Sequence, residues 1–263
     1  IHLTAWSDAS GDVQGRLNYI HFLASQRDAR QAEAALETFV AEDPEDTSLR
    51  LALGQLYETN DRPDEARRAY EALAGLSPKS ADGLAARNRL AALEIRAGRI
   101  PEAMAIVDGI LKDAPDDAGA LLLRAGGRFT DGKFDDAIAD LRLVLRKEAE
   151  NEKALLLLAQ AYVRTSDLVL AKDSYRRLLE VNPKSPEGLA QLASVYAAER
   201  NFAEAEALLR QRVADAPDDL VASGRLVETL LAQQKTSEAE KEARRMAALE
   251  SQAGVGDFSL GRV

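Results

Sequence analysis

The segment Gly127–Lys133 has the glycine and lysine spacing of a phosphate-binding P-loop, GxxxxGK followed by Ser or Thr. In a P-loop the backbone N–H groups surround the phosphates, the lysine contacts them, and the hydroxyl binds Mg²⁺. Phe134 stands here in place of the hydroxyl-bearing residue. A P-loop also follows a β-strand, so the match indicates nucleotide binding only if a strand precedes Gly127.

Paired carboxylates are the other residues that could do chemistry, as an acid and a base or as cation ligands. Asp135-Asp136 and Asp218-Asp219 are two such pairs. Both stand where helices are expected to begin, where negative charge complements the helix dipole, and no calcium-loop spacing surrounds them. The chain has no cysteine and only two histidines. The sequence therefore predicts helix capping at these pairs, and no catalytic residue, metal or cofactor.

The charge balance disfavours some classes of partner. The 263 residues carry a net charge of −10, and the sequence pI is near 4.9. Nucleic-acid binding requires a basic face, so RNA-binding helical repeats are disfavoured. No apolar run approaches the roughly 20 residues that span a bilayer. The first residue is Ile1 and not Met, so a leader or an anchor outside the given residues remains open.

The strongest signal is an internal period of 34 residues, with a single gap of 37, in three series of residues. One series of prolines, in which one step is doubled, comprises Pro44, Pro78, Pro115, Pro183 and Pro217. A series of alanines comprises Ala32, Ala66, Ala103, Ala137, Ala171, Ala205 and Ala239. A third series comprises Ile20, Gly54, Ala91, Ala125, Ala159, Ala193, Val227 and Gly261.

Each period contains the apolar pattern of two short helices. In residues 152–185 the first helix shows one apolar face at i, i+3, i+4 and i+7, formed by Leu155, Leu158, Ala159 and Tyr162. After a polar break the pattern returns from Ala171, and Asn182-Pro183 ends it. The next helix is expected to begin with Ser185 as its N-cap. Each period therefore predicts a helix, a short turn, a second helix and another short turn.

Small residues recur where the two helices of a hairpin should cross. Gly or Ala at a crossing lets the two backbones approach closely, while larger side chains fill the space beside them. One such hairpin cannot bury its apolar face alone, but stacked neighbours can. The sequence therefore predicts an all-α solenoid of antiparallel helix pairs.

These residues resemble the tetratricopeptide repeat family. Its pattern places a small residue and Tyr in the first helix, then Ala, an aromatic residue and Pro, and residues Gly54, Tyr57, Ala66, Tyr70 and Pro78 follow it closely. The resemblance implies a right-handed superhelix of seven complete repeats, at residues 13–46, 47–80, 84–117, 118–151, 152–185, 186–219 and 220–253. Residues 81–83 are extra and explain the gap of 37, so the first helix of the third repeat is expected to start one turn early.

Both ends of the chain fall inside further repeats. Residues 254–263 match the start of a truncated eighth repeat. Residues 1–12 fall where a preceding second helix would end, or where an N-terminal cap would lie, with Trp6 as a buried anchor. The chain is therefore interpreted as a fragment of a longer array.

The same register explains the P-loop match. Residues 129–134 occupy the turn between the two helices of the fourth repeat, so Gly132 is expected to end a helix and Phe134 to pack into the hairpin. Arg124 and Arg128 depart from the family pattern at positions where Leu and Tyr are expected. Their charged groups either reach solvent and nearby acids such as Asp136 and Asp140, or form a basic spot that receives a partner's carboxylate.

In the family that this chain resembles, the first helix of each repeat lines a concave groove. The resemblance assigns thirteen residues to that groove: Leu51, Gln55, Asn88, Ala92, Leu122, Gly126, Phe129, Leu156, Gln160, Val163, Arg164, Ala190 and Ser194. Their small, apolar and amide side chains suit an extended peptide or a helix. The chaperone-binding subgroup instead has a Lys/Asn/Arg clamp, and Leu17, His21, Leu51 and Gln55 stand at its key positions here.

The sequence therefore predicts a non-enzymatic scaffold that binds another protein. The alternative is a docking or regulatory segment of a larger enzyme, or of an exopolysaccharide or secretion machine. The composition resembles that of bacterial repeat proteins, including cell-envelope lipoproteins, which favours the periplasmic side of the envelope without excluding the cytoplasm. No direct membrane insertion by these residues is expected.

Overall fold

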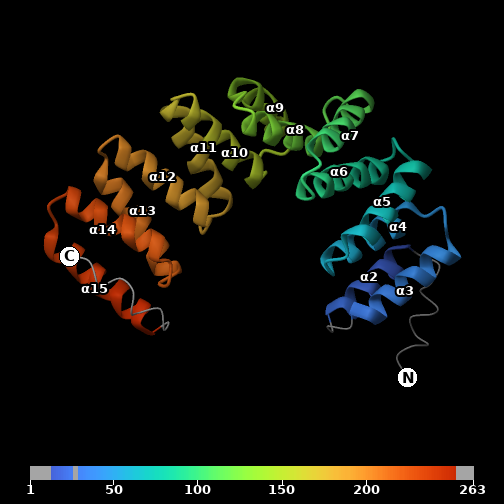
Figure 1. Ribbon diagram of the computed structural model, residues 1–263, viewed down its shortest axis with the longest axis horizontal. Helices are drawn as coiled ribbons and strands as arrows, with labels where there is room; N and C mark the ends of the chain where they lie inside the picture. Colours follow the sequence, from blue (N-terminus) through green and yellow to red (C-terminus); the bar gives the residue numbers. More distant parts are fainter. Residues whose placement is uncertain (1–12, 26–28, 253–263) are drawn as a thin grey trace. The chain divides into compact units, whose positions relative to one another are not determined.

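The structure, a computed structural model, describes residues 13–25 and 29–252, and all regular secondary structure in them is helical. The expected N-terminal segment with Trp6 and the expected eighth repeat lie outside these residues. The helices, labelled in Figure 1, are α2 (Val13–Ser25), α3 (Ala29–Glu42), α4 (Thr47–Thr59), α5 (Pro63–Leu76), α6 (Ala81–Arg96), α7 (Ile100–Asp113), α8 (Ala118–Thr130), α9 (Phe134–Lys147), α10 (Glu152–Arg164), α11 (Leu168–Val181), α12 (Pro186–Ala198), α13 (Phe202–Asp215), α14 (Leu220–Ala232) and α15 (Thr236–Gln252).

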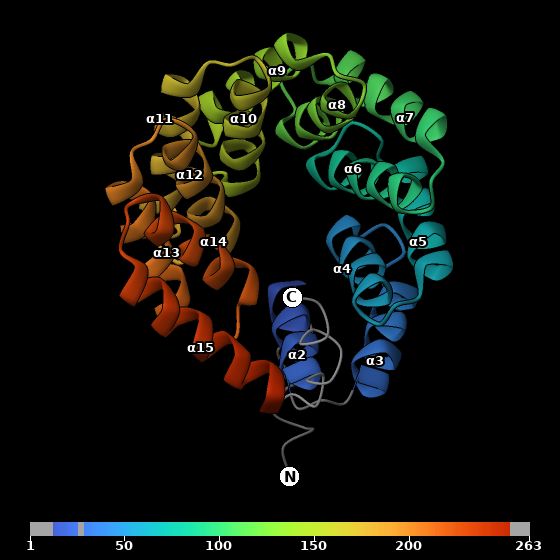
Figure 2. The same cartoon turned by 60° about the vertical axis from the view of Figure 1, so that its left-hand side comes forward.

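Helices that follow one another in the chain pack side by side as hairpins, for example α4 with α5 and α10 with α11 (Figures 1 and 2). The chain divides into two compact bodies. We call residues Ile1–Arg124 the N-terminal body and residues Ala125–Val263 the C-terminal body. Helix α8 begins in the first and ends in the second.

A residue in the left-handed backbone region stands in the turn inside six hairpins. These residues recur with the period found in the sequence, and their φ angles lie between 55° and 76°: Asp61, Gly98, Gly132, Ser166, Arg200 and Gln234. In the fourth repeat the N–H of Lys133 then donates to the carbonyl of Arg128 at 2.8 Å. The same bond, from the residue after the left-handed one to a carbonyl five residues back, recurs in the other five turns and closes each first helix.

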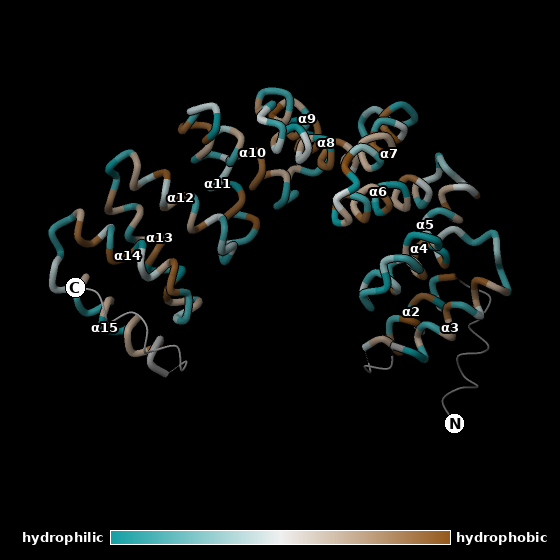
Figure 3. The backbone as a smooth tube through the Cα atoms, viewed as in Figure 1, coloured by the Kyte–Doolittle hydropathy of each residue, from teal (hydrophilic) through white to brown (hydrophobic). Residues whose placement is uncertain are grey.

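The recurring alanines form the contacts between helices. Every residue of the alanine series, from Ala32 to Ala239, is at most 2% exposed. In the third series the residues from Gly54 to Ala193 are buried, Val227 is half-buried, and Gly261 lies outside the described residues. Figure 3 shows apolar residues interleaved with hydrophilic ones along the helices, as expected when one face of each helix is buried.

Side-chain caps begin many of the helices. Ser185 caps α12, accepting a hydrogen bond from the N–H of Gly188 at 3.2 Å, and Pro186 follows at the first helical position. Asp135 and Asp136 lie in the first turn of α9, where they complement the helix dipole. Asp219 caps α14 and accepts from the N–H of Ala222 at 2.9 Å. The predicted caps Ser185 and Asp219 are confirmed, whereas α9 has no side-chain cap, and Asp135 and Asp136 act there only through their charge in its first turn.

Helix α6 begins at Ala81, one turn before the third repeat as predicted from the sequence, and is capped by Ser80. The three extra residues therefore extend this helix rather than the loop before it. The assignment of the helix pairs to seven repeats with the boundaries given above stays a prediction. No described helix is both long and apolar enough to cross a membrane.

Candidate functional site

The segment that resembled a P-loop is a turn between two helices. Helix α8 precedes it, Gly132 has a φ of 76°, and α9 begins at Phe134. The same turn forms in four other hairpins around a residue other than glycine or lysine, such as Ser166. The glycine therefore serves the backbone geometry of the turn, and the nucleotide interpretation has no structural support.

The predicted groove residues all lie on the first helices of their hairpins, α4, α6, α8, α10 and α12. Gln55 and Arg164 are exposed, and the other eleven are half-buried. The five from Leu51 to Leu122 belong to the N-terminal body and are called its inner face. The eight from Gly126 to Ser194 belong to the C-terminal body and are called its inner face.

The N-terminal inner face includes a polar pocket of about 410 Å³ beside Gln55. Its centre is Glu58, whose carboxylate accepts from Arg96 at 2.7 Å and from the Tyr70 hydroxyl at 3.0 Å, with Arg89 at 3.8 Å. Burial and then the Glu58 charge raise the pKa of Tyr70, so its hydroxyl stays a hydrogen-bond donor. The sequence analysis placed only Gln55 here. Arg89 follows the inward position of Asn88 by one residue, whereas Arg96 stands at the same position of its repeat as the selected Arg164 and was not selected.

Asn88, a second predicted residue of the N-terminal inner face, supports a neighbouring helix. Its side-chain amide donates to Asp117 at 2.8 Å, and the same oxygen of Asp117 accepts from the N–H of Ala120, in the first turn of α8. The side-chain oxygen of Asn88 is buried without a hydrogen-bond partner among the described residues. The side-chain amide of Asn88 therefore supports the cap that Asp117 forms on α8, and it is not free to contact a partner.

An aromatic and cationic group forms one end of the C-terminal inner face. The rings of Phe129 and Phe134 pack edge to face with centroids 5.3 Å apart. The guanidinium of Arg164 lies 5.1 Å from the centre of the Phe134 ring, within the range of a cation–π contact. The predicted residues Phe129 and Arg164 are therefore brought together by Phe134, which the sequence analysis assigned only to hairpin packing.

Arg225 of α14 bounds the other end of the C-terminal inner face. Its guanidinium donates to the Ala190 carbonyl at 3.2 Å and to the Ser194 hydroxyl at 3.0 Å, both on α12. Both acceptors are neutral, and no ion pair of Arg225 occurs among the described residues. The sequence analysis did not select Arg225, which follows the inward position of its repeat by one residue.

The middle of the C-terminal inner face is apolar. Leu156 and Val163 of α10 are half-buried and pack on the core cluster that contains Ala159 and Leu192. Gln160, half-buried, lies between them in the sequence of the same helix. This face therefore presents apolar contact area with an amide in its middle and Arg164 and Arg225 at its ends.

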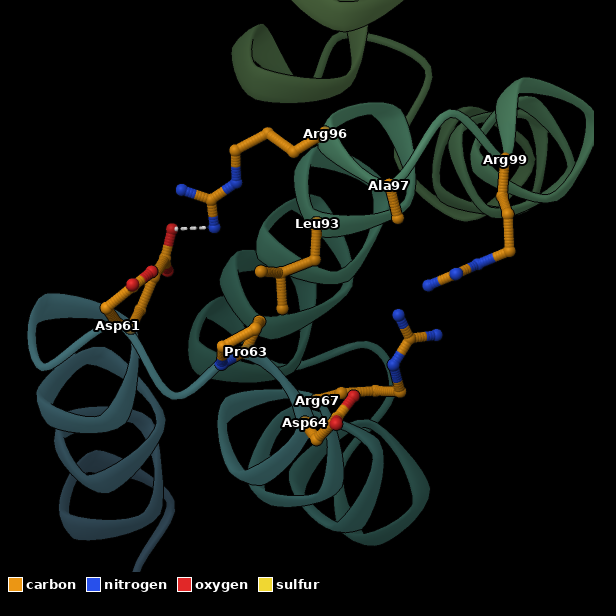
Figure 4. A pocket seen from close by; sticks show the side chains of 9 residues that line it. Asp61, Pro63, Asp64, Arg67, Leu93, Arg96, Ala97 and Arg99 are labelled. Carbon is orange, nitrogen blue, oxygen red and sulfur yellow. Dashed lines mark hydrogen bonds and ion pairs between the residues drawn. The ribbon is translucent and has the colours of Figure 1, made fainter.

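Another pocket in the N-terminal body, of about 330 Å³, is drawn in Figure 4. Arg67 and Arg99, which point toward one another in Figure 4, both hydrogen-bond to Glu94, which is 5% exposed. They tie α5, α6 and the start of α7 together through one buried carboxylate. Because these cations are already paired with that acid, we assign this pocket to the structure of the hairpin junction.

Arg128 takes the structural role that the sequence analysis left open. Its guanidinium pairs with Asp140 of α9 at 2.6 Å, and the Asp140 side chain is 3% exposed. The backbone carbonyl of Asp136 also accepts from Arg128 at 3.2 Å.

Among the described residues, no three His, Asp or Glu side chains gather closely enough to hold a metal ion. The side chains of the two inner faces are suited to hydrogen bonding and apolar contact.

Comparison with known proteins shows the family of the chain. A family model described as tetratricopeptide repeat matches residues 23–81, and a second with the same description matches residues 128–195 and 166–223. Together the matches cover more than half of the chain. No curated protein matches the sequence.

Solved structures show the same fold at low sequence identity. A chain of the APC/C hetero-tetramer Cut9-Hcn1 aligns with a TM-score of 0.70 and 16% identity over 82% of this chain and 42% of that chain, so this chain spans less than half of that neighbour. The type IV pilus biogenesis factor PilW aligns with a TM-score of 0.65 and 21% identity over 82% of this chain and 96% of that chain. The chain also aligns with pilF of Pseudomonas aeruginosa, with a TM-score of 0.66 and 16% identity over 80% of this chain and 93% of that chain. The predicted all-α solenoid is confirmed.

Proposed function

Because the chain belongs to the tetratricopeptide repeat family, whose repeats generally mediate protein–protein interaction, we propose that it is a non-enzymatic scaffold that binds an extended peptide or a helix of another protein. The binding residues are those of the two inner faces. The C-terminal inner face supplies most of the contact.

One observation carries this proposal. On the C-terminal inner face Leu156 and Val163 are half-buried and so partly open to a partner, and the guanidinium of Arg225 contacts only neutral oxygens among the described residues. Apolar contacts in a shallow groove supply affinity, and an amide such as that of Gln160 can bond the backbone of an extended segment. A carboxylate of the partner would find an available cation in Arg225.

The test begins with the partner itself. The full chain is immobilised, proteins from a lysate of the source organism are captured, and each is identified by mass spectrometry and then purified. We expect Leu156→Glu to weaken binding of the purified partner by about tenfold or more, because a charge replaces apolar contact at the centre of the site. Leu122→Glu should weaken any contact with the N-terminal inner face.

A matched control adds the same charge elsewhere. Ala214 is exposed on the second helix of its hairpin, α13, so Ala214→Glu should leave the affinity unchanged. Circular dichroism of all variants must show the helix content of the unmodified chain. If Leu156→Glu and Leu122→Glu bind as tightly as Ala214→Glu, the inner faces are not the binding site.

The alternative, a docking segment within a larger assembly, has one observation in its favour. The neighbour in the APC/C hetero-tetramer is more than twice as long as the aligned region, so this fold occurs there as part of a longer chain. A gene that continues into a domain without repeats would support the docking role. The envelope location stays a prediction, which cell fractionation with an antibody against the chain would test.

A further inference from the structure

Helix α11 begins differently from the other second helices of the C-terminal body. Helices α9, α13 and α15 each carry an acidic residue in the first turn, and α11 carries none. The segment Leu168-Val169-Leu170 occupies this turn, with Val169 75% exposed and Leu170 40% exposed. The acid at this end of the helix is the N-cap residue Asp167, and the first turn itself exposes apolar surface to water.

Leu170 also lines a pocket of about 330 Å³ that is formed by α9, α10 and α11. The apolar part of the pocket includes Leu145 and Leu158, which are 8% and 4% exposed. Three arginines line the remainder, Arg142, Arg146 and Arg177, together with one acid, Asp173. The pocket lining therefore combines apolar side chains with an excess of positive charge.

These arginines have no carboxylate partner among the described residues. Arg142 donates to the Tyr162 hydroxyl at 3.0 and 2.7 Å, which holds its guanidinium in place, and Arg177 approaches the Ala149 carbonyl at 3.4 Å. Arg146 is exposed and makes no side-chain hydrogen bond or ion pair with any residue that the structure describes. The chain has a net charge of −10, but three cations and one acid make the charge of this pocket positive. A positive pocket attracts acidic groups.

We propose that this pocket and the adjoining Leu168–Leu170 segment form a second docking site, for a peptide segment in which an apolar residue is flanked by carboxylates. The apolar residue would contact Val169 and Leu170, and the carboxylates would meet Arg146 and Arg177. The observations favour a peptide over a membrane, because the overall negative charge repels anionic lipid. This site is independent of the proposed inner faces, since it involves none of their thirteen residues.

The experiment uses the full chain and a defined probe. A fluorescein-labelled hexapeptide, Asp-Glu-Leu-Leu-Asp-Glu, is titrated with protein and followed by fluorescence anisotropy. We expect saturable binding that weakens as salt is raised, because exposed charge pairs are screened. Replacing the four acids by lysine, or the two leucines by serine, should each abolish binding, since both parts of the pocket are needed.

Matched variants locate the site on the protein. Arg146→Glu and Val169→Asp should each weaken binding by about tenfold, as one charged and one apolar contact are lost. The control variants are Arg68→Glu, on exposed surface of α5, and Val221→Asp, whose side chain is 68% exposed at the start of α14. Both controls should bind the probe as the unmodified chain does. Leu156→Glu should also bind it normally, which separates this result from a failure of the inner-face proposal.

Three outcomes would overturn the proposal. The first is equal weakening by the control variants and by Arg146→Glu, which would indicate a general effect of charge. The second is binding to vesicles of phosphatidylglycerol without binding to the peptide, which would make the surface a lipid contact. The third is concentration-dependent dimerisation that Val169→Asp removes and that blocks the peptide, which would make the patch an interface between two copies.

Discussion

Arg128 and Tyr162 of the C-terminal body stand at equivalent positions of neighbouring hairpins, but their side chains make different contacts. Both stand at the position that the family pattern gives to Tyr, and the backbone carbonyl of each accepts the closing bond of the turn at 2.8 Å. Arg128 pairs with Asp140 in the second helix of its own hairpin. The Tyr162 hydroxyl instead accepts two N–H groups of Arg142, in the hairpin before it.

The difference shows how a repeat can be altered without changing its backbone. In a solenoid, stability is approximately the sum of a term for each repeat and a term for each interface. The ion pair of Arg128 and Asp140 contributes within one hairpin, whereas the hydroxyl of Tyr162 contributes between two. The Arg128–Asp140 contact joins two charged groups and is largely buried, whereas the contact of Arg142 with Tyr162 has a neutral hydroxyl as its acceptor. Variants of the two positions can therefore separate the chemistry of a contact from its placement.

The largest effect is expected for Arg128→Leu. It removes one charged partner of Asp140, whose side chain is 3% exposed, and the loss of a hydrogen bond between charged groups at a buried carboxylate costs about 3 kcal/mol. Urea denaturation followed by circular dichroism measures the loss. The double variant Arg128→Leu/Asp140→Leu should recover part of it, because two apolar groups replace the pair while the other interaction of Asp140 is also lost. A double variant as unstable as the single one would show that the cost comes from lost packing and not from the charge.

A charged contact between hairpins provides the next comparison. Burial raises the pKa of Glu206, but hydrogen bonds from Lys235, Arg210 and Gln233 outweigh it and lower the value from 4.5 to about 2. Because the folded-state pKa lies below the unfolded value, this stabilisation is present above pH 4.5 and is lost as the pH falls toward 2. Glu206→Gln should therefore cost about 2 kcal/mol near neutral pH, and its difference from the unmodified chain should shrink in acid.

Thermal denaturation of both proteins across the acid range tests this dependence. Near neutral pH the melting temperature of Glu206→Gln should be lower by about 5 °C, since about 2 kcal/mol changes it by a few degrees in a chain of this size. A difference that is constant with pH would mean that the charge of Glu206 contributes nothing.

Tyr162→Phe should have a smaller effect. It removes one hydroxyl and leaves the N–H groups of Arg142 free to meet water, because the Arg142 side chain is exposed. The net contribution of such a hydrogen bond is about 1 kcal/mol. The variant should weaken the coupling between the α8–α9 and α10–α11 hairpins, which hydrogen exchange of the α9 amides would detect. Faster exchange confined to α10 and α11 would contradict the placement of this contact between hairpins.

The sequence predicted the repeating backbone better than the contacts that distinguish one repeat from another. The period located the hairpins and the buried alanines, because close helix crossings require small residues at regular spacing. It did not predict that Ser166 and Arg200 adopt the left-handed region, since their types carry no such signal and the repeat imposes the geometry. The partner of Arg142 lies 20 residues away in another hairpin, so only the three-dimensional structure shows which arginines remain without an acid.

The smallest predicted effect concerns the turn that follows these two positions. Gly132 has a φ of 76° after Arg128, and Ser166 has a φ of 65° after Tyr162. A residue with a Cβ is strained in this region by about 1 kcal/mol, whereas glycine is not but makes the unfolded chain more flexible. Ser166→Gly should therefore stabilise the chain by about 0.5 kcal/mol, and Gly132→Ala should destabilise it by a similar amount. Ser166→Ala, measured beside them by urea denaturation, isolates the hydroxyl and should be nearly neutral. If Ser166→Gly is destabilising, the polar side chain and not the backbone holds this turn, and the hairpins of Arg128 and Tyr162 differ in their turns as well as in their contacts.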